Sequence, residues 1–158
     1  MWASAITAYV HYLSLGTIFA TLATELFTLK RDLTAKEGWR IMVADTLYGI
    51  AGLAALVTGV LRVLYYAKEP SYYTHQPLFW VKIGIYVLVG TLSLYPTFAF
   101  LRWIPPLRQD KAPEVSEDLV ARLKTIIRIE LVGYSTIPLM ASLMARGIGS
   151  DWVSFLNS

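Results

Sequence analysis

Ionisable side chains interrupt several long apolar stretches of this sequence, and they are the residues that could do chemistry. Such groups are costly to bury in a membrane, so each needs a partner, water or a function. Their positions along the chain predict two layers at different depths. A histidine with two cations forms one layer, and mainly acids form the other. The members are His11, Arg62 and Lys82 in the first layer, and Glu25, Asp45, Arg128 and Glu130 in the second.

The first layer could hold a tetrapyrrole. A neutral imidazole such as that of His11 is an adequate axial ligand for haem iron or chlorophyll magnesium. Arg62 and Lys82 could pair with porphyrin carboxylates, and glycines in the second apolar segment could leave room for a flat ring. The alternative interpretation is a hydrogen-bonded histidine beside two cations that extend toward the headgroups. Haem b or chlorophyll bound through His11 is therefore one of two open predictions.

The second layer combines three acids with one base. The first interpretation is a structural ion-pair network that includes Arg128. The alternative is a proton or cation site, in which Glu25 and Asp45 could share a proton. Helical geometry places Glu130 on the opposite side of its helix from Arg128, so we predict that Glu130 faces a partner outside the bundle.

Motifs for other chemistries are missing from the sequence. The chain has no cysteine, which excludes disulfides, iron–sulfur clusters and thiolate metal sites. It also has no phosphate-binding glycine loop, no zinc-ligand spacing and no nucleophile motif. The sequence therefore favours a protein without catalytic activity and leaves an enzyme open.

The segments that must position these residues are membrane spans. The chain has 158 residues, of which 56% are hydrophobic and 16% charged, whereas a soluble domain is usually about 25% charged. Its mean hydropathy is +0.51. Spans are predicted at 5–29, 41–66, 79–103 and 122–146, each about long enough to cross a bilayer. Two short links make neighbours antiparallel, so we expect an all-α, four-helix transmembrane antiparallel bundle that forms a single domain over 1–158.

A helical period of about 100° per residue predicts which face of each span points inward. Pro96 should kink the third span, where the Ser93 and Thr97 hydroxyls lie near the carbonyl of Leu92 that the proline leaves without its donor. The expected inward faces are His11, Ser14, Ile18, Thr21 and Glu25; Asp45, Gly49, Gly52, Leu56 and Gly59; Lys82, Tyr86, Val89, Ser93 and Pro96; and Arg128, Ser135, Leu139, Ser142 and Arg146.

The distribution of lysine and arginine predicts the orientation. Of the 14 basic residues, ten fall in or beside the links after the first and third spans, and four lie toward the other side. Because basic residues favour the cytoplasmic side, both termini are expected on the non-cytoplasmic side.

Several stretches occur in an order that resembles a known family. They are AYVHYLSL and TELF in the first span, VADTLYGIAGL in the second, FWVKI with LSLYPTFAFL in the third and IPLMASLMARGIG in the fourth. On these stretches the chain resembles the DUF2214 family of small predicted membrane proteins, found in bacteria including cyanobacteria. That resemblance implies a membrane protein and no established activity. A more distant similarity, through His11 and Lys82, is to the four-helix, haem-carrying membrane protoporphyrinogen oxidase type.

From these features we predict a non-catalytic accessory or assembly subunit of a larger bioenergetic or photosynthetic membrane complex. It would be multi-pass in a bacterial inner or thylakoid membrane. Its expected partners are membrane lipid and other membrane-protein subunits or a second copy of itself, and not nucleic acid. One alternative is a haem-dependent membrane oxidoreductase of the protoporphyrinogen oxidase type, and a further one is a proton or cation conductor.

Overall fold

Four long helical segments make up most of the protein in this computed structural model, which describes residues 1–66 and 70–148. Two parts of these predictions lie outside the described residues. They are Lys68, one of the four basic residues expected toward the non-cytoplasmic side, and residues 149–158 of the predicted domain. The segments Trp2–Thr28, Ala35–Tyr66, Pro77–Leu101 and Glu117–Ala145 are long and apolar enough to cross a membrane. The predicted all-α bundle with four membrane spans is confirmed, while the side on which the termini lie stays a prediction.

The spans are divided into shorter elements at two places. Helix α2 continues into a π-helical turn, η1, and a break after α4 separates it from α5. Two short helices, α3 and α6, lie in the links. The bounds are α1 Trp2–Thr28, α2 Ala35–Leu61, η1 Arg62–Tyr66, α3 Pro70–Thr74, α4 Pro77–Leu92, α5 Leu94–Leu101, α6 Ile104–Leu107 and α7 Glu117–Ala145.

Two helices begin earlier than their apolar runs. Helix α2 begins at Ala35 rather than at the predicted 41, because Thr34 caps its polar first turn. Helix α7 begins at Glu117 rather than at 122, because the hydroxyl of Ser116 accepts a hydrogen bond from the Leu119 amide at 3.2 Å. Membrane spans can therefore extend into the interface as capped polar turns that hydropathy alone does not include.

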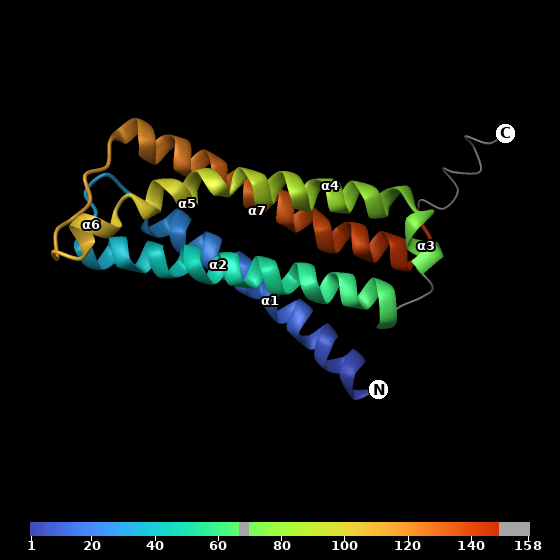
Figure 1. Cartoon of the computed structure of the whole chain (residues 1–158). Coiled ribbons are helices and arrows are strands. Elements are labelled where there is room, and N and C mark those ends of the chain that lie inside the picture. The colour runs from blue at the N-terminus through green and yellow to red at the C-terminus, as the bar shows by residue number, and fades with distance from the viewer. Residues whose placement is uncertain (67–69, 149–158) are drawn as a thin grey trace.

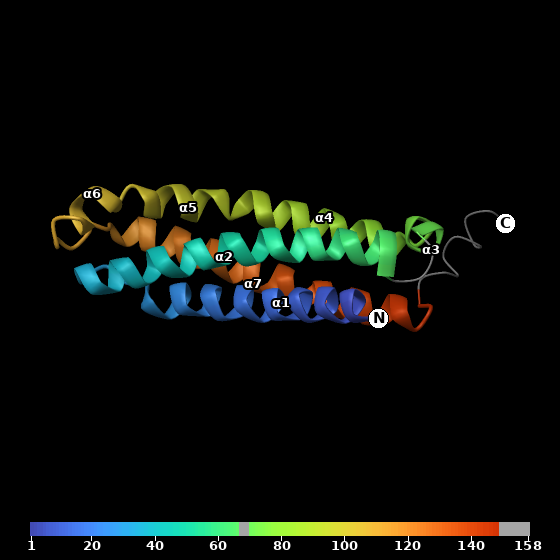
Figure 2. The ribbon, with the colours of Figure 1, turned by 60° about the horizontal axis from the view of Figure 1, so that its bottom comes forward.

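The spans are arranged as two packed pairs. Helix α1 packs along α2, and α4 packs along α7. The start of α1, the end of α2, the start of α4 and the end of α7 lie at one end of the bundle, so consecutive spans run antiparallel (Figure 1). Figure 2 shows the same lengthwise arrangement after rotation. We call this end the first-layer end, because His11, Arg62 and Lys82 belong to it, and we call the opposite end the loop end.

The outward surface of the bundle is apolar along its length. Leu13, Leu53, Leu88 and Val132 are exposed, one on each span, whereas an apolar core of buried residues fills the space between the helices. In water such a surface would be an aggregation hazard, but lipid tails cover it at no cost. Contact with membrane lipid follows from this distribution.

The inward face predicted for α7 is wrong. Arg128, Ser135, Leu139 and Arg146 are exposed. The face that packs on the other spans lies about half a turn away. Apolar residues recur on it at helical spacing, and one acid lies among them. It consists of Leu123, Ile127, Glu130, Tyr134, Ile137 and Met144.

The face predicted for α2 is also displaced. Gly49 and Leu56 are exposed, and the buried stripe includes Tyr48, Ala51, Ala55 and Thr58 instead. At the α4–α5 break, the Ser93 hydroxyl donates to the Gly90 carbonyl at 2.8 Å. The second hydroxyl near the break, that of Thr97, donates to Asp45 at 2.8 Å. Neither hydroxyl is bonded to the Leu92 carbonyl. The Ser93 bond stays within the third span, and the Thr97 bond joins the third span to the second.

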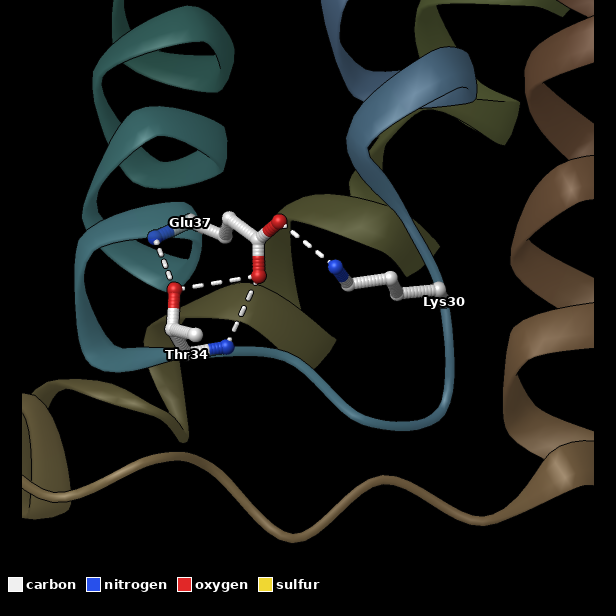
Figure 3. Close-up of polar contacts among 3 residues, drawn as sticks. All are labelled: Lys30, Thr34 and Glu37. Atoms are coloured by element: carbon white, nitrogen blue, oxygen red, sulfur yellow. Dashed lines mark hydrogen bonds and ion pairs between the residues drawn. The ribbon is translucent and has the colours of Figure 1, made fainter.

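A capping box fixes the turn between α1 and α2 (Figure 3). The Thr34 hydroxyl accepts from the Glu37 amide at 3.2 Å, and the Thr34 amide donates to the Glu37 carboxylate at 2.9 Å. Lys30 donates to the same carboxylate at 2.6 Å. This reciprocal arrangement satisfies donors that the first helical turn leaves unpaired.

Replacing Thr34 by Ala should therefore destabilise the protein by about 1 kcal/mol, the usual effect of losing an N-cap hydroxyl. Thermal unfolding in mild detergent measures this loss. Thr34→Ser is the matched control, because serine keeps the capping oxygen, and it should stay close to wild type. Equal losses in both variants would contradict the capping role.

Gly133 permits the close approach of α7 to α4. A Cβ atom added at Gly133 would lie 2.5 Å from Cγ2 of Val89, which is too close for two carbon atoms that are not bonded to each other. Val89 is buried and stiff at χ1, so it cannot turn away without disturbing α4.

Gly133→Ala should lower the free energy of unfolding by about 1–3 kcal/mol, the usual range for overpacking. Adding Val89→Ala should recover part of that loss in a double-mutant cycle measured by thermal unfolding. Gly90→Ala serves as the control on α4, because nothing lies within 4 Å of its added Cβ. Additive effects of the Gly133 and Val89 changes would show that this contact does not hold the pair together.

Candidate functional site

One face of α2 makes a polar contact with another span at nearly every turn. Asp45 starts this series at the loop end, and the last contact lies about 15 Å away at the helical rise of about 1.5 Å per residue. The donors come from α5, α4 and α1, and α2 itself donates once, to α7. The contacts are Thr97 Oγ1 to Asp45 Oδ1 at 2.8 Å, Tyr48 Oη to Tyr134 Oη at 3.2 Å, Tyr86 Oη to the Gly52 carbonyl at 2.6 Å, and His11 Nδ1 to the Ala55 carbonyl at 3.1 Å.

Three buried carboxyls gather at the loop-end part of this face. Glu25 of α1 and Glu130 of α7 are each 1% exposed, and Asp45 of α2 is 8% exposed. The prediction that Glu130 faces a partner outside the bundle is therefore wrong, because its carboxyl is buried on the face of α7 that packs on the other spans. Each of the three is near enough to the other two for their charges to interact. We call these residues the carboxyl cluster. Because Thr97 on α5 donates a hydrogen bond to Asp45, residues from all four spans meet at the carboxyl cluster.

No basic side chain neutralises the carboxyl cluster in the part of the chain that the structure describes. The ion pairs there are Lys30 with Glu37 and Arg31 with Glu117, both on the surface. Oε1 of Glu25 and Oε1 of Glu130 are buried without a hydrogen-bond partner. The expected ion-pair network with Arg128 is therefore wrong, because the Arg128 side chain is exposed.

This environment limits the ionisation of the carboxyl cluster. Ionised carboxylates at close range repel one another, and a dry surrounding raises the cost of each charge. The cluster is not arranged as a metal centre, since no group of three acid or histidine side chains within residues 1–66 and 70–148 could hold a metal ion. Protons can compensate carboxylates at these positions, and groups so coupled titrate together.

Two tyrosines beside the carboxyl cluster, Tyr48 and Tyr134, are not among the residues expected from the sequence to face inward, whereas Tyr86 is. Tyr48 lies next to Glu130, and Tyr86 and Tyr134 follow with ring centroids 6.2 Å apart. The three rings are buried or half-buried, and they point inward from three different spans. The four-residue interval from Glu130 to Tyr134 was the signal available in the sequence, because it places both residues on one helical face.

His11 is held against α2 at the first-layer end. Its Nδ1 lies 3.1 Å from the Ala55 carbonyl and 3.0 Å from Thr58 Oγ1. The Thr58 hydroxyl donates its own hydrogen to the Ala54 carbonyl at 2.6 Å, so both atoms near Nδ1 act as acceptors. This network assigns the proton to Nδ1 and leaves the lone pair of Nε2 available for a proton or a metal.

The glycine nearest to His11 accommodates the imidazole itself. A Cβ atom at Gly59 would lie 3.3 Å from Cε1 of His11, so the absence of a side chain there makes room for the ring of the histidine. Arg62 and Lys82 are close enough to His11 for their charges to interact with it. The three predicted residues of the first layer are thus brought together, and the room for a flat ring beside Gly59 is filled by His11.

Haem or chlorophyll binding through His11 stays a prediction. The Nδ1 hydrogen bond to a carbonyl resembles the support that metal-binding histidines usually have. If Nε2 is an axial ligand, protein purified in mild detergent from cells with adequate haem supply should show a Soret-region band that disappears in His11→Ala. His75→Ala is the control and should keep the band. A colourless wild-type protein would contradict tetrapyrrole binding.

Comparison with known proteins gives one match. The family described as predicted membrane protein (DUF2214) matches residues 3–149. No curated protein and no solved structure matches the chain. The similarity to the protoporphyrinogen oxidase type thus rests on His11 and Lys82 alone and stays a prediction. Since the match spans all four apolar helices, the chain belongs to the DUF2214 family of predicted membrane proteins.

Proposed function

We propose that this membrane protein conducts protons across the bilayer and that the carboxyl cluster is its proton-binding site. The observation that carries the proposal is the pair of buried oxygens without hydrogen-bond partners, Oε1 of Glu25 and Oε1 of Glu130. A carboxylate in that position is unstable unless it takes up a proton, so the cluster stores and exchanges protons. Sharing among three carboxyls lets one proton leave while another enters.

Hydroxyl groups extend the polar face from the carboxyl cluster toward the first-layer end. A tyrosine hydroxyl can donate and accept a hydrogen bond at the same time, which a relay requires. Tyr48 next to Glu130 and its hydrogen bond to Tyr134 form the first steps. The next groups along α2 toward the first-layer end are Tyr86, bonded at Gly52, and His11, bonded at Ala55. The Nε2 atom of His11 can accept a proton. A complete relay would need water molecules in the intervals between these groups.

Proton flux into liposomes driven by a potassium diffusion potential tests this function. Wild-type protein should acidify the lumen, as reported by an enclosed pH-sensitive dye. Glu130→Gln should reduce the flux to that of protein-free liposomes, because the amide cannot bind and release a proton in this range. Glu114→Gln is the matched control, since Glu114 is exposed and lies outside the cluster, and it should conduct as wild type does.

A second readout separates proton binding from a merely structural role of the glutamate. Infrared difference spectra should show the carbonyl band of a protonated carboxyl in wild type at neutral pH, and Glu130→Gln should lose intensity in that band. Tyr48→Phe should keep the band and lower the flux, because it removes the hydroxyl next to the acid while keeping the ring. Wild-type flux equal to that of empty liposomes would refute conduction.

The role as an accessory or assembly subunit of a larger membrane complex stays a prediction beside this proposal. Exposed apolar faces suit lipid and protein partners equally, so they do not favour the role over the other predictions. The buried carboxyls give conduction a specific chemical basis that the subunit role lacks.

A further inference from the structure

The end of the bundle opposite the carboxyl cluster gathers positive charge. His11 from α1, Arg62 from η1 and Lys82 from α4 lie within range of one another's charges, with electrostatic interactions between His11 and each cation and between the two cations. We call these three residues the basic cluster. No acidic side chain pairs with them within the described residues, where both ion pairs lie at the loop end.

Arg62 makes this arrangement unstable without a further group. Lysine and histidine can lose a proton when they are buried, but a guanidinium stays charged. Nη1 of Arg62 is buried without a hydrogen-bond partner. The nearest compensation is the Tyr12 ring, whose centroid lies 5.2 Å from the guanidinium carbon. A cation–π contact does not replace the hydrogen bonds that the guanidinium would have in water.

Lys82 is in a similar position. Its Nζ lies 5.3 Å from the centroid of the Phe79 ring, and its ammonium has no ion-pair partner in the described chain. The exposed Trp80 two positions earlier is typical of the membrane–water interface. The basic cluster therefore lies at the depth where lipid phosphates and dissolved anions can both arrive.

We propose that the basic cluster binds a phosphate group. The guanidinium of Arg62 can donate two parallel hydrogen bonds to phosphate oxygens, which is its preferred geometry. Lys82 adds a second positive charge. His11 donates from Nε2 when it carries a second proton, because Nδ1 is already bonded to α2. The phosphate belongs either to a phospholipid headgroup or to an inorganic ion, and the inference requires neither a tetrapyrrole nor proton conduction.

Thermal unfolding of the full-length protein in mild detergent tests the site. The probes are lysophosphatidylglycerol and inorganic phosphate, each compared with chloride at the same ionic strength. A ligand that binds the folded state raises the unfolding midpoint as its concentration rises. Arg62→Gln should weaken binding by about tenfold or more, the effect of losing one charge-assisted hydrogen bond or more. Arg146→Gln, which removes an exposed cation at the same end, should leave binding unchanged.

The outcomes distinguish the two sources. A rise with lysophosphatidylglycerol alone assigns the site to a lipid headgroup, and a rise with inorganic phosphate as well assigns it to a free phosphate. If Arg62→Gln does not fold, Lys82→Gln replaces it and should also weaken binding. Absence of any rise over chloride overturns the inference, as does an equal loss in Arg146→Gln, which would indicate nonspecific attraction to a basic surface.

Discussion

The hydrogen bonds that α2 makes with the other spans determine how this bundle is assembled. Lipid tails are as apolar as leucine, so burial of apolar side chains gives membrane helices little reason to associate. Thr97 with Asp45, Tyr48 with Tyr134 and Tyr86 with the Gly52 carbonyl connect α2 to the third and fourth spans. His11 with the Ala55 carbonyl connects α2 to the first. Because every contact has a specific partner, the same bonds fix the rotation of each helix and therefore which ionisable residues face the interior.

The sequence was sufficient to predict the spans but not the rotation of every helix. Hydropathy and length identify four membrane helices, and the first and third faces follow from regular polar and small residues, such as Ser14 and Ser93, which are buried. The face of α7 was predicted from its charged and hydroxyl residues, yet Arg128 can extend toward the headgroups and so need not face inward. Glu130 has a shorter side chain and cannot do the same. Tyr48 was missed because a tyrosine in an apolar run is compatible with either the core or the lipid interface.

Opposite charges lie at the two ends of the same polar face. Among residues 1–66 and 70–148, acids without a base gather near Asp45, and cations without an acid gather near Arg62. A protein that used these residues only for stability would gain by placing an acid beside a base, since an unpaired buried charge is destabilising. The two proposals account for this separation by compensation from outside the protein chain. Protons can neutralise the acids, and an anion can neutralise the cations.

The distance between the two clusters makes them separate sites. Asp45 and Arg62 lie about 25 Å apart along α2 at about 1.5 Å per residue. Two unit charges at that distance interact by about 0.7 kcal/mol at an effective dielectric constant of about 20. That energy changes an equilibrium constant by only about threefold, which is small beside the cost of leaving either cluster uncompensated. Direct attraction between the ends of α2 therefore cannot stabilise the buried charges. On the two proposals each cluster has its own ligand, and removing one charge should affect the nearby site far more than the distant one.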